Sequence, residues 1–159
     1  ALINQGKDNV VITRTFSKVH GMAGMRMGYG IATENTAHKI KPFAAGFNLS
    51  AAALAAASAA LDDKPFYKKS IEFNQLSKTI LIDTLNELKL AHIPSDTNFV
   101  LHEIGTPLAD YAQHMQQNGV RVGRKMTQDD HWNRISLGTP DEMMIFSQTL
   151  KAFRQEGWV

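Results

Sequence analysis

The stretch that decides the fold is Thr15 to Tyr29, TFSKVHGMAGMRMGY, which holds one lysine, one arginine and three glycines. The β-branched run that leads into it, Val10 to Thr15, predicts a buried strand, and the glycines that follow predict a tight loop. The glycine spacing is G-x-x-G-x-x-x-G, and no G-K-[ST] triplet follows it. Dinucleotide and P-loop motifs require other spacings, so neither kind of nucleotide site is predicted here.

The loop has the residue types that a cofactor with both an aldehyde and a phosphate requires. A lysine that forms a Schiff base with pyridoxal phosphate has to project from a short, rigid turn, and Lys18 lies in such a turn. Hydroxyl groups and a bidentate arginine bind phosphate well, and Thr15, Ser17 and Arg26 provide them. Two plainer interpretations stay open at this point, namely Lys18 as a solvated surface lysine and Arg26 as a structural ion-pair partner.

The quoted stretch resembles the Schiff-base segment of class I/II aminotransferases, and its nearest likeness is the histidinol-phosphate aminotransferase branch. Later stretches resemble further landmarks of that branch: FNLSAAALAAASAALDD at 47–63, SDTNFVLHEI at 95–104 and NRISLGTPDEM at 133–143. One departure is Val19-His20, since a small residue commonly follows the lysine in that family. The resemblance implies pyridoxal 5'-phosphate as cofactor, with Lys18 as the catalytic Schiff-base lysine, Thr15, Ser17 and Arg26 at the cofactor phosphate, and Arg134 at the substrate carboxylate.

Arg134 also has a weaker case that does not depend on the resemblance. It stands just before the apolar part of a predicted strand, where a charge needs a partner, and an arginine fork suits a carboxylate. The plain alternative is an exposed arginine at the start of a strand. Arg124 and Lys125 could line a substrate entrance, although both are interpreted first as solvated.

The rest of the chain predicts an α/β protein that corresponds to the C-terminal part of a fold-type-I pyridoxal-phosphate enzyme. By the resemblance, residues 1–63 are the tail of the large cofactor-binding domain, which is incomplete, and residues 64–159 are a small α+β domain. Asp62 to Pro65 is the predicted boundary. We expect residues 1–63 to be disordered, self-associated or re-paired in isolation, because strands without neighbours leave exposed edges. The predicted helices are 34–40, 49–61, 66–90, one from Thr106-Pro107 to 117 and one from Thr139-Pro140 to 153, and the other predicted strands are 29–33, 98–104, 120–122 and 134–137.

The implied reaction is amino-group transfer between an amine such as histidinol phosphate and a 2-oxo acid such as 2-oxoglutarate. Asp8 is the only aspartate before Lys18 in this sequence. It lies too close to Lys18 to match the family's aspartate at the ring nitrogen of the cofactor. We therefore expect the 159-residue chain alone to be an inactive fragment. Two alternatives remain: another pyridoxal-phosphate chemistry, such as decarboxylation or C–S lysis, and a folding or association module without catalysis.

Composition excludes several other classes of function. The chain is 43% hydrophobic and 20% charged, with a net charge of +2, and no cluster of Lys and Arg predicts nucleic-acid binding. Its longest apolar stretch, Leu49 to Leu61, is too short to span a membrane. There are no cysteines, and the six histidines have no metal-ligand spacing, so we expect no metal and interpret every histidine as exposed or hydrogen-bonded. We expect a cytoplasmic protein that is a homodimer at full length.

Overall fold

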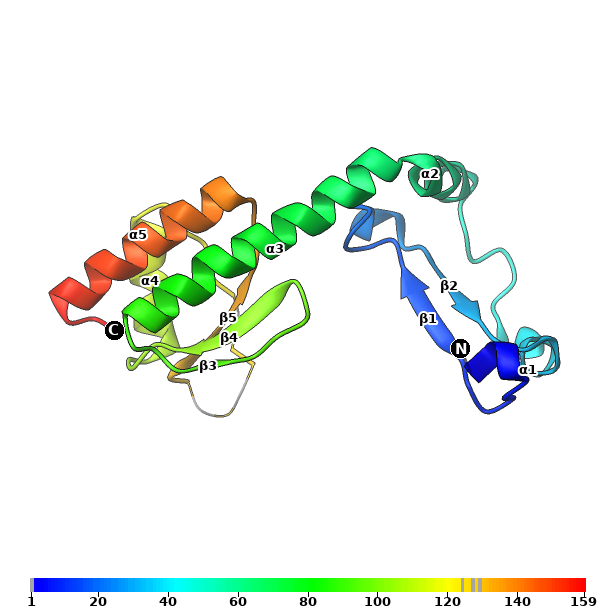
Figure 1. The fold of residues 1–159 in the computed structure, drawn as a ribbon, viewed down its shortest axis with the longest axis horizontal. Coiled ribbons are helices and arrows are strands. Elements are labelled where there is room, and N and C mark those ends of the chain that lie inside the picture. Colours follow the sequence, from blue (N-terminus) through cyan, green and yellow to red (C-terminus); the bar gives the residue numbers. More distant parts are fainter. Residues whose placement is uncertain (1, 124, 127, 129) are drawn as a thin grey trace. The chain divides into compact units, whose positions relative to one another are not determined.

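The computed structural model describes residues 2–123, 125–126, 128 and 130–159, and they form two compact units, Ala1–Ser70 and Ile71–Val159 (Figure 1). The division falls inside one unbroken helix, α3 (Lys64–Glu87). Both units combine helices with antiparallel strands, which confirms the α/β class. Assignment of residues 1–63 to a cofactor domain and of 64–159 to a small domain stays a prediction.

The first unit is built on a two-stranded sheet. Strands β1 (Ile12–Thr15) and β2 (Gly28–Ile31) pair antiparallel, with Thr15 opposite Gly28. A side chain at Gly28 would place its Cβ 2.6 Å from the carbonyl oxygen of Arg14, so this pairing requires glycine. Two helices follow, α1 (Glu34–Ile40) and α2 (Ala51–Asp62), and the side chains of Thr33 and Ser50 cap them.

The prediction of a buried strand at residues 10–15 is wrong. Strand β1 begins at Ile12, and three of its four residues are exposed. Among the described apolar residues of this unit, Phe16, Ala53 and Ala57 are buried, whereas the side chains of Phe43 and Phe47 are almost wholly exposed. A buried strand needs covering layers on its faces, and the described chain does not provide them here.

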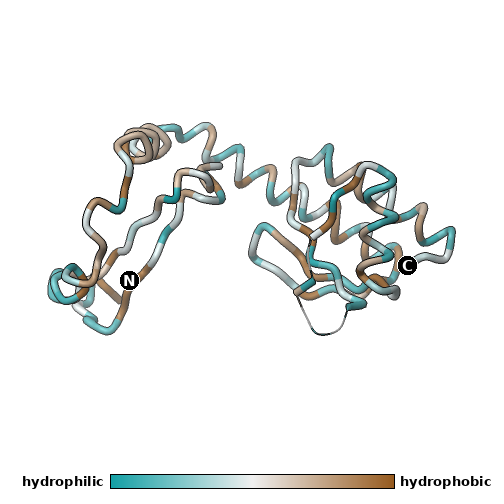
Figure 2. Tube along the Cα trace, turned by 180° about the vertical axis from the view of Figure 1, so that it is seen from behind, coloured by the Kyte–Doolittle hydropathy of each residue, from teal (hydrophilic) through white to brown (hydrophobic). Residues whose placement is uncertain are grey.

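The second unit packs helices on a three-stranded antiparallel sheet of order β3-β4-β5. Its strands are β3 (His92–Ile93), β4 (Phe99–Glu103) and β5 (Trp132–Ser136), and its helices are the second part of α3, α4 (Leu108–Gln117) and α5 (Pro140–Glu156). Alternation along the strands turns Val100, His102, Asn133 and Ile135 inward. The helices alternate between hydrophobic and hydrophilic stretches (Figure 2), as amphipathic helices over a core do. The core includes Leu81, Leu85, Ile104, Tyr111, Met115, Phe146, Leu150 and Phe153.

Local start signals predict one helix of this unit better than another. Helix α5 begins with the predicted capping box: the Thr139 hydroxyl accepts from the backbone N–H of Glu142, and the Glu142 carboxylate accepts from that of Thr139. At α4 the predicted cap by Thr106 is wrong, because Pro107 is the N-cap and no side chain caps the helix. The N–H of Leu108 donates instead to the carbonyl of Asp130.

The predicted strand at residues 120–122 is also wrong. The N–H of Val120 donates to the carbonyl of Met115 at 2.9 Å, so this segment closes the C-terminus of α4 instead of joining the sheet. Helix α3 ends at Glu87, three residues before the predicted end, and Lys89 takes the left-handed conformation just beyond it. Among the described helices, none is both long and apolar enough to cross a membrane.

Candidate functional site

The backbone of Phe16 shapes the loop that carries Lys18. Its N–H donates to the carbonyl of Met27 at 3.2 Å, and its own carbonyl accepts from the N–H of Met22 at 3.0 Å. The Phe16 side chain is buried, which anchors the loop to the unit. Gly21, at φ +67°, donates its N–H to the carbonyl of Lys18 at 2.9 Å. The loop is thus closed on itself and leaves the lysine exposed.

Lys18 lies at the wall of a cavity of about 480 Å³ within the first unit. That volume is in the range of small-molecule sites, which is roughly 300–1,000 Å³. Aromatic rings form much of the wall: the ring of His20 lies 5.0 Å from that of Phe16 and 5.7 Å from that of Tyr67, between centroids. The lining residues are Thr13, Arg14, Thr15, Phe16, Lys18, Val19, His20, Tyr29 and Tyr67.

Two hydroxyl groups converge at the base of the loop. The Thr15 hydroxyl donates to Oγ of Ser17 at 2.9 Å, and the backbone N–H of Ser17 donates to Oγ1 of Thr15 at 3.0 Å. Thr15 is among the cavity-lining residues, and Ser17 is attached to it through this pair of hydrogen bonds. In this arrangement the Ser17 hydroxyl keeps its proton for a phosphate oxygen, and the Thr15 hydroxyl could donate to the same phosphate after rotating away from Ser17.

Arg26 does not join these groups at the cavity wall. Its Nη1 donates to the carbonyl of Ala23 at 2.6 Å, which folds the side chain onto its own turn, and Arg26 is not among the lining residues. Its backbone has φ +54°, a left-handed conformation that is uncommon for any residue other than glycine. Its predicted role at a phosphate therefore stays a prediction.

Acidic groups are not found at this cavity. None of the described residues that line it is an aspartate or a glutamate. The side chains of Thr33 and Asn35 donate hydrogen bonds to the Asp8 carboxylate. These bonds hold the pKa of Asp8 below its usual value, and the bond from Thr33 has the larger effect. Asp8 therefore ties the start of the unit to the N-terminus of α1. The lining residues fit the aldehyde and phosphate end of pyridoxal phosphate, and they do not include an acid for its ring nitrogen.

Arg134 lies in the second unit, on the outward face of β5. Its guanidinium carbon is 3.9 Å from the centroid of the Phe99 ring, and its Nη1 is 3.5 Å from Oγ of Ser136. Among the residues that the structure describes, no carboxylate lies within ion-pair distance of it. The side chain is half-buried and carries a charge that these residues do not neutralise.

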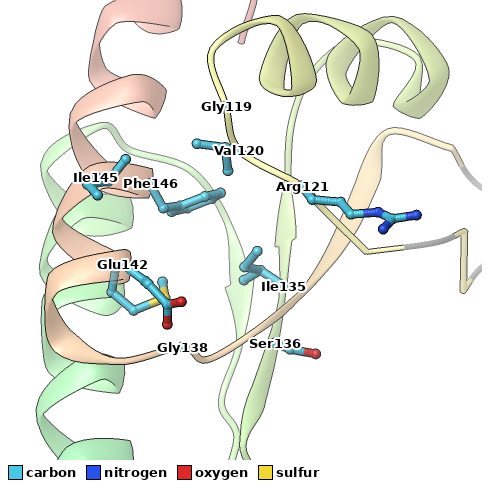
Figure 3. A pocket seen from close by; sticks show the side chains of 10 residues that line it. Gly119, Val120, Arg121, Ile135, Ser136, Gly138, Glu142, Ile145 and Phe146 are labelled. Atoms are coloured by element: carbon cyan, nitrogen blue, oxygen red, sulfur yellow. The ribbon is translucent and has the colours of Figure 1, made fainter.

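A second cavity, of about 340 Å³, lies between α5, β5 and the segment after α4. Val120, Ile135 and Phe146 point into the same space, while the guanidinium of Arg121 points away from it (Figure 3). The hollow is therefore lined mostly by apolar groups, and its acidic lining residue, Glu142, is engaged in the capping box of α5. The predicted entrance residue Arg124 lies outside the described residues, and Lys125 is 4.0 Å from the Asp130 carboxylate.

Two aromatic residues of the first cavity were missed by the sequence analysis. Tyr67 belongs to α3, and no local motif marks it. His20 was interpreted as exposed or hydrogen-bonded, which is wrong for its Nδ1 atom, since that atom is buried without a hydrogen-bond partner in the described structure. The same correction applies to Nδ1 of His114. The described chain has no group of acids and histidines placed to hold a metal ion.

The comparison with known proteins fits this description. The sequence profile of the family "Aminotransferase class I and II" matches residues 2–150. The chain therefore belongs to the class I and II aminotransferase family.

Within the family the similarity is to histidinol-phosphate aminotransferases. The one from Symbiobacterium thermophilum is 36% identical over 96% of this chain and 43% of its own length. A crystal structure of a proposed histidinol-phosphate aminotransferase from Erwinia carotovora atroseptica matches with a TM-score of 0.91 at 40% identity, over 99% of this chain and 46% of that one. The Sinorhizobium meliloti histidinol-phosphate aminotransferase in complex with pyridoxal-5'-phosphate matches with a TM-score of 0.76 at 31% identity, over 94% and 42%. The chain thus spans less than half the length of these relatives.

Proposed function

We propose that this chain is the C-terminal portion of a pyridoxal-phosphate-dependent aminotransferase that acts on histidinol phosphate or a related amine and on a 2-oxo acid such as 2-oxoglutarate. One observation carries the proposal: Lys18 and Thr15 line a single cavity with aromatic walls, in a chain that belongs to the aminotransferase family. The relative that is described with bound pyridoxal-5'-phosphate supports the choice of cofactor.

The residues of the first cavity divide between cofactor binding and proton transfer. Pyridoxal phosphate, when bound, supplies the electron sink that makes the α-hydrogen of an amine substrate acidic. Lys18 would hold the cofactor at its aldehyde group through Nζ, and its amine, when free, would move the proton at the substrate α-carbon. The hydroxyls of Thr15 and Ser17 would hold the phosphate, and the guanidinium of Arg26 would join them after leaving the carbonyl of Ala23. The rings of Phe16 and Tyr29, whose centroids lie 5.9 Å apart, form part of the cavity wall.

Arg134 is the residue that we assign to the carboxylate of the 2-oxo acid substrate. Its half-buried charge has no acidic partner in the described part of the chain, so it is available to an anionic ligand. A planar guanidinium binds a carboxylate through two parallel hydrogen bonds, and this fixes the orientation of the substrate about its α-carbon. The C–H bond at the substrate α-carbon, which breaks or forms in the reaction, is then held in a fixed orientation.

The chain alone is expected to be inactive, because the cavity offers no acid to the ring nitrogen of the cofactor. We propose that the larger part of the family's length, which this chain does not span, supplies that acid and completes the sheet. We further propose that the complete protein is a cytoplasmic homodimer.

The test is an amino-transfer assay with histidinol phosphate and 2-oxoglutarate that measures glutamate. It is run on the 159-residue chain and on the extended protein, which carries the preceding sequence that we propose its gene encodes. We expect turnover only in the extended protein, and its loss in a Lys18→Arg variant of that protein. Turnover by the extended Lys18→Arg variant at the rate of the unsubstituted protein would refute the assignment of Lys18, and turnover by the short chain would refute its inactivity.

A further inference from the structure

We propose that Phe99 is a positioning residue for Arg134, and that Ser136 assists it. Together they hold the guanidinium against the outward face of β4 and β5, so that its free N–H groups are presented as a fixed fork for a carboxylate. This inference rests on the proposed function, since it deepens the role of Arg134 in substrate binding. It assigns a purpose to an aromatic residue on the outward face of the sheet.

The sheet register brings the three side chains together. Phe99 on β4 is directly opposite Ser136 on β5, and Arg134 stands two residues before Ser136, on the same face. Arg134 and Phe99 are therefore diagonal neighbours, a spacing that long and aromatic side chains can bridge. They do bridge it, because the guanidinium carbon lies 3.9 Å from the ring centroid. That distance is well inside the limit of about 6 Å for a cation–π contact.

The contact restrains the arginine without using up its hydrogen-bonding groups. A cation over an aromatic ring is held by the charge distribution of the ring, so the contact consumes no N–H donor. Of the five N–H donors of a guanidinium, one is directed at Oγ of Ser136, at the long distance of 3.5 Å. The remaining donors have no carboxylate partner among the described residues. An arginine that is held in this way needs to lose less side-chain freedom when a ligand binds.

The ligand class follows from the geometry. The Phe99 ring covers one side of the guanidinium, so a ligand approaches from the uncovered side or along the N–H edge. A planar carboxylate matches that edge with two parallel hydrogen bonds. A lysine in place of Arg134 could not form the fork, because an ammonium group is a compact point charge. The group that this fork would take is therefore the carboxylate of the 2-oxo acid, approaching from the side of the guanidinium that the Phe99 ring leaves open.

The test uses the whole 159-residue chain, labelled with ¹⁵N, and observes the Nε–Hε group of Arg134 by NMR. An Arg134→Lys variant assigns the signal by removing it. Phe99→Leu removes the ring, Phe99→Tyr keeps it, and Phe43→Leu is a matched control at an exposed phenylalanine of the other unit. The readouts are the ring-current shift and the heteronuclear NOE of this group, followed by titration with 2-oxoglutarate.

In the unsubstituted chain we expect a ring-current-shifted, ordered Nε–Hε signal that moves further as 2-oxoglutarate is added. Phe99→Leu should lose the shift and the order and weaken 2-oxoglutarate binding by about two- to fivefold, the fold-change that one exposed cation–π contact is worth. Phe99→Tyr and Phe43→Leu should keep all three. If Phe99→Leu leaves the signal unchanged, the positioning role is overturned while the assignment of Arg134 stands. If 2-oxoglutarate binds the Arg134→Lys variant as well as the unsubstituted chain, the proposed role of Arg134 itself is overturned.

Discussion

Acid should destabilise the second unit through His102, which is buried in its core. The side chain is fully inaccessible; its Nδ1 is 3.0 Å from the carbonyl of Glu103, and its Nε2 is 3.2 Å from Nδ2 of Asn133. Nδ1 faces a carbonyl oxygen and therefore carries the proton of the neutral ring, and Nε2 accepts a hydrogen bond from the amide N–H of Asn133. Protonation of Nε2 would break this hydrogen bond. The pKa of His102 is lowered from 6.5 to about 4: burial is the main cause, the hydrogen bond to the Glu103 carbonyl partly opposes it, and the charge of His92, opposite it on β3, adds to the lowering.

The sign and size of the effect follow from that shift. Between pH 6.5 and pH 4 the unfolded chain binds a proton at His102 and the folded chain does not, so the unfolded state gains stability as the pH falls. The contribution is complete above pH 6.5 and is lost progressively down to about pH 4. One pKa unit corresponds to about 1.4 kcal/mol, so the loss over this window is about 3 kcal/mol.

Urea denaturation between pH 4 and pH 7, followed by tryptophan fluorescence, measures this loss. Both tryptophans, Trp132 and Trp158, lie in the second unit, so their fluorescence reports on its unfolding. A His102→Gln variant removes the titrating group and keeps every other acid and histidine. Its free energy of unfolding should therefore fall by about 3 kcal/mol less over the same window. Parallel loss of stability in both proteins would refute the reasoning, as would an NMR titration in which the folded His102 ring is protonated near pH 6.5.

Three further substitutions test the fold. Thr139→Ala removes the cap of α5 and should lower the free energy of unfolding of the second unit by about 1 kcal/mol; an unchanged urea midpoint would show that the cap is dispensable. Gly28→Ala places a Cβ 2.6 Å from the carbonyl oxygen of Arg14 and should break the β1–β2 pairing, whereas Gly24→Ala has open space around it; equal hydrogen-exchange rates of the β1 amides in the two variants would contradict the register. Leu85→Ala removes a fully buried core side chain and should lower the free energy of unfolding by about 2–5 kcal/mol. Leu76→Ala, at a half-exposed position of the same helix, should change it by no more than about 0.5 kcal/mol. Equal urea midpoints of the two variants would contradict the assignment of Leu85 to the core.

Features that depend on neighbouring residues in the sequence were predicted well. The capping box joins Thr139 and Glu142, which are three residues apart in the sequence, so the sequence alone predicts the start of α5. The glycine loop around Lys18 is likewise local, because Gly21, at φ +67°, donates its N–H to the carbonyl of Lys18. The family motif was recognised in this loop for the same reason.

Features that depend on distant partners were not predicted. Burial of β1 requires other layers, and the apolar character of Val10 to Thr15 could not show whether the described chain has them. The segment 120–122 has the composition of a strand, but the N–H of Val120 donates to the carbonyl of Met115 near the end of α4 instead of pairing with a strand. The stacking of Phe99 on Arg134 depends on the register between β4 and β5, which no short motif encodes. Tyr67 reaches the cavity of Lys18 from helix α3, which is distant from the loop in sequence.

The central claim is that Lys18 is the lysine that binds pyridoxal phosphate. The most direct measurement is reduction of the chain with borohydride after incubation with the cofactor, followed by peptide mapping by mass spectrometry. Lys39 and Lys41, both exposed on the first unit, serve as internal controls for non-specific labelling. A second incubation with pyridoxal, which has no phosphate, tests the role of Thr15 and Ser17. The account predicts that Lys18 is labelled at lower cofactor concentrations than Lys39 and Lys41, and that this preference is lost with pyridoxal. Equal labelling of the three lysines by pyridoxal phosphate would contradict it.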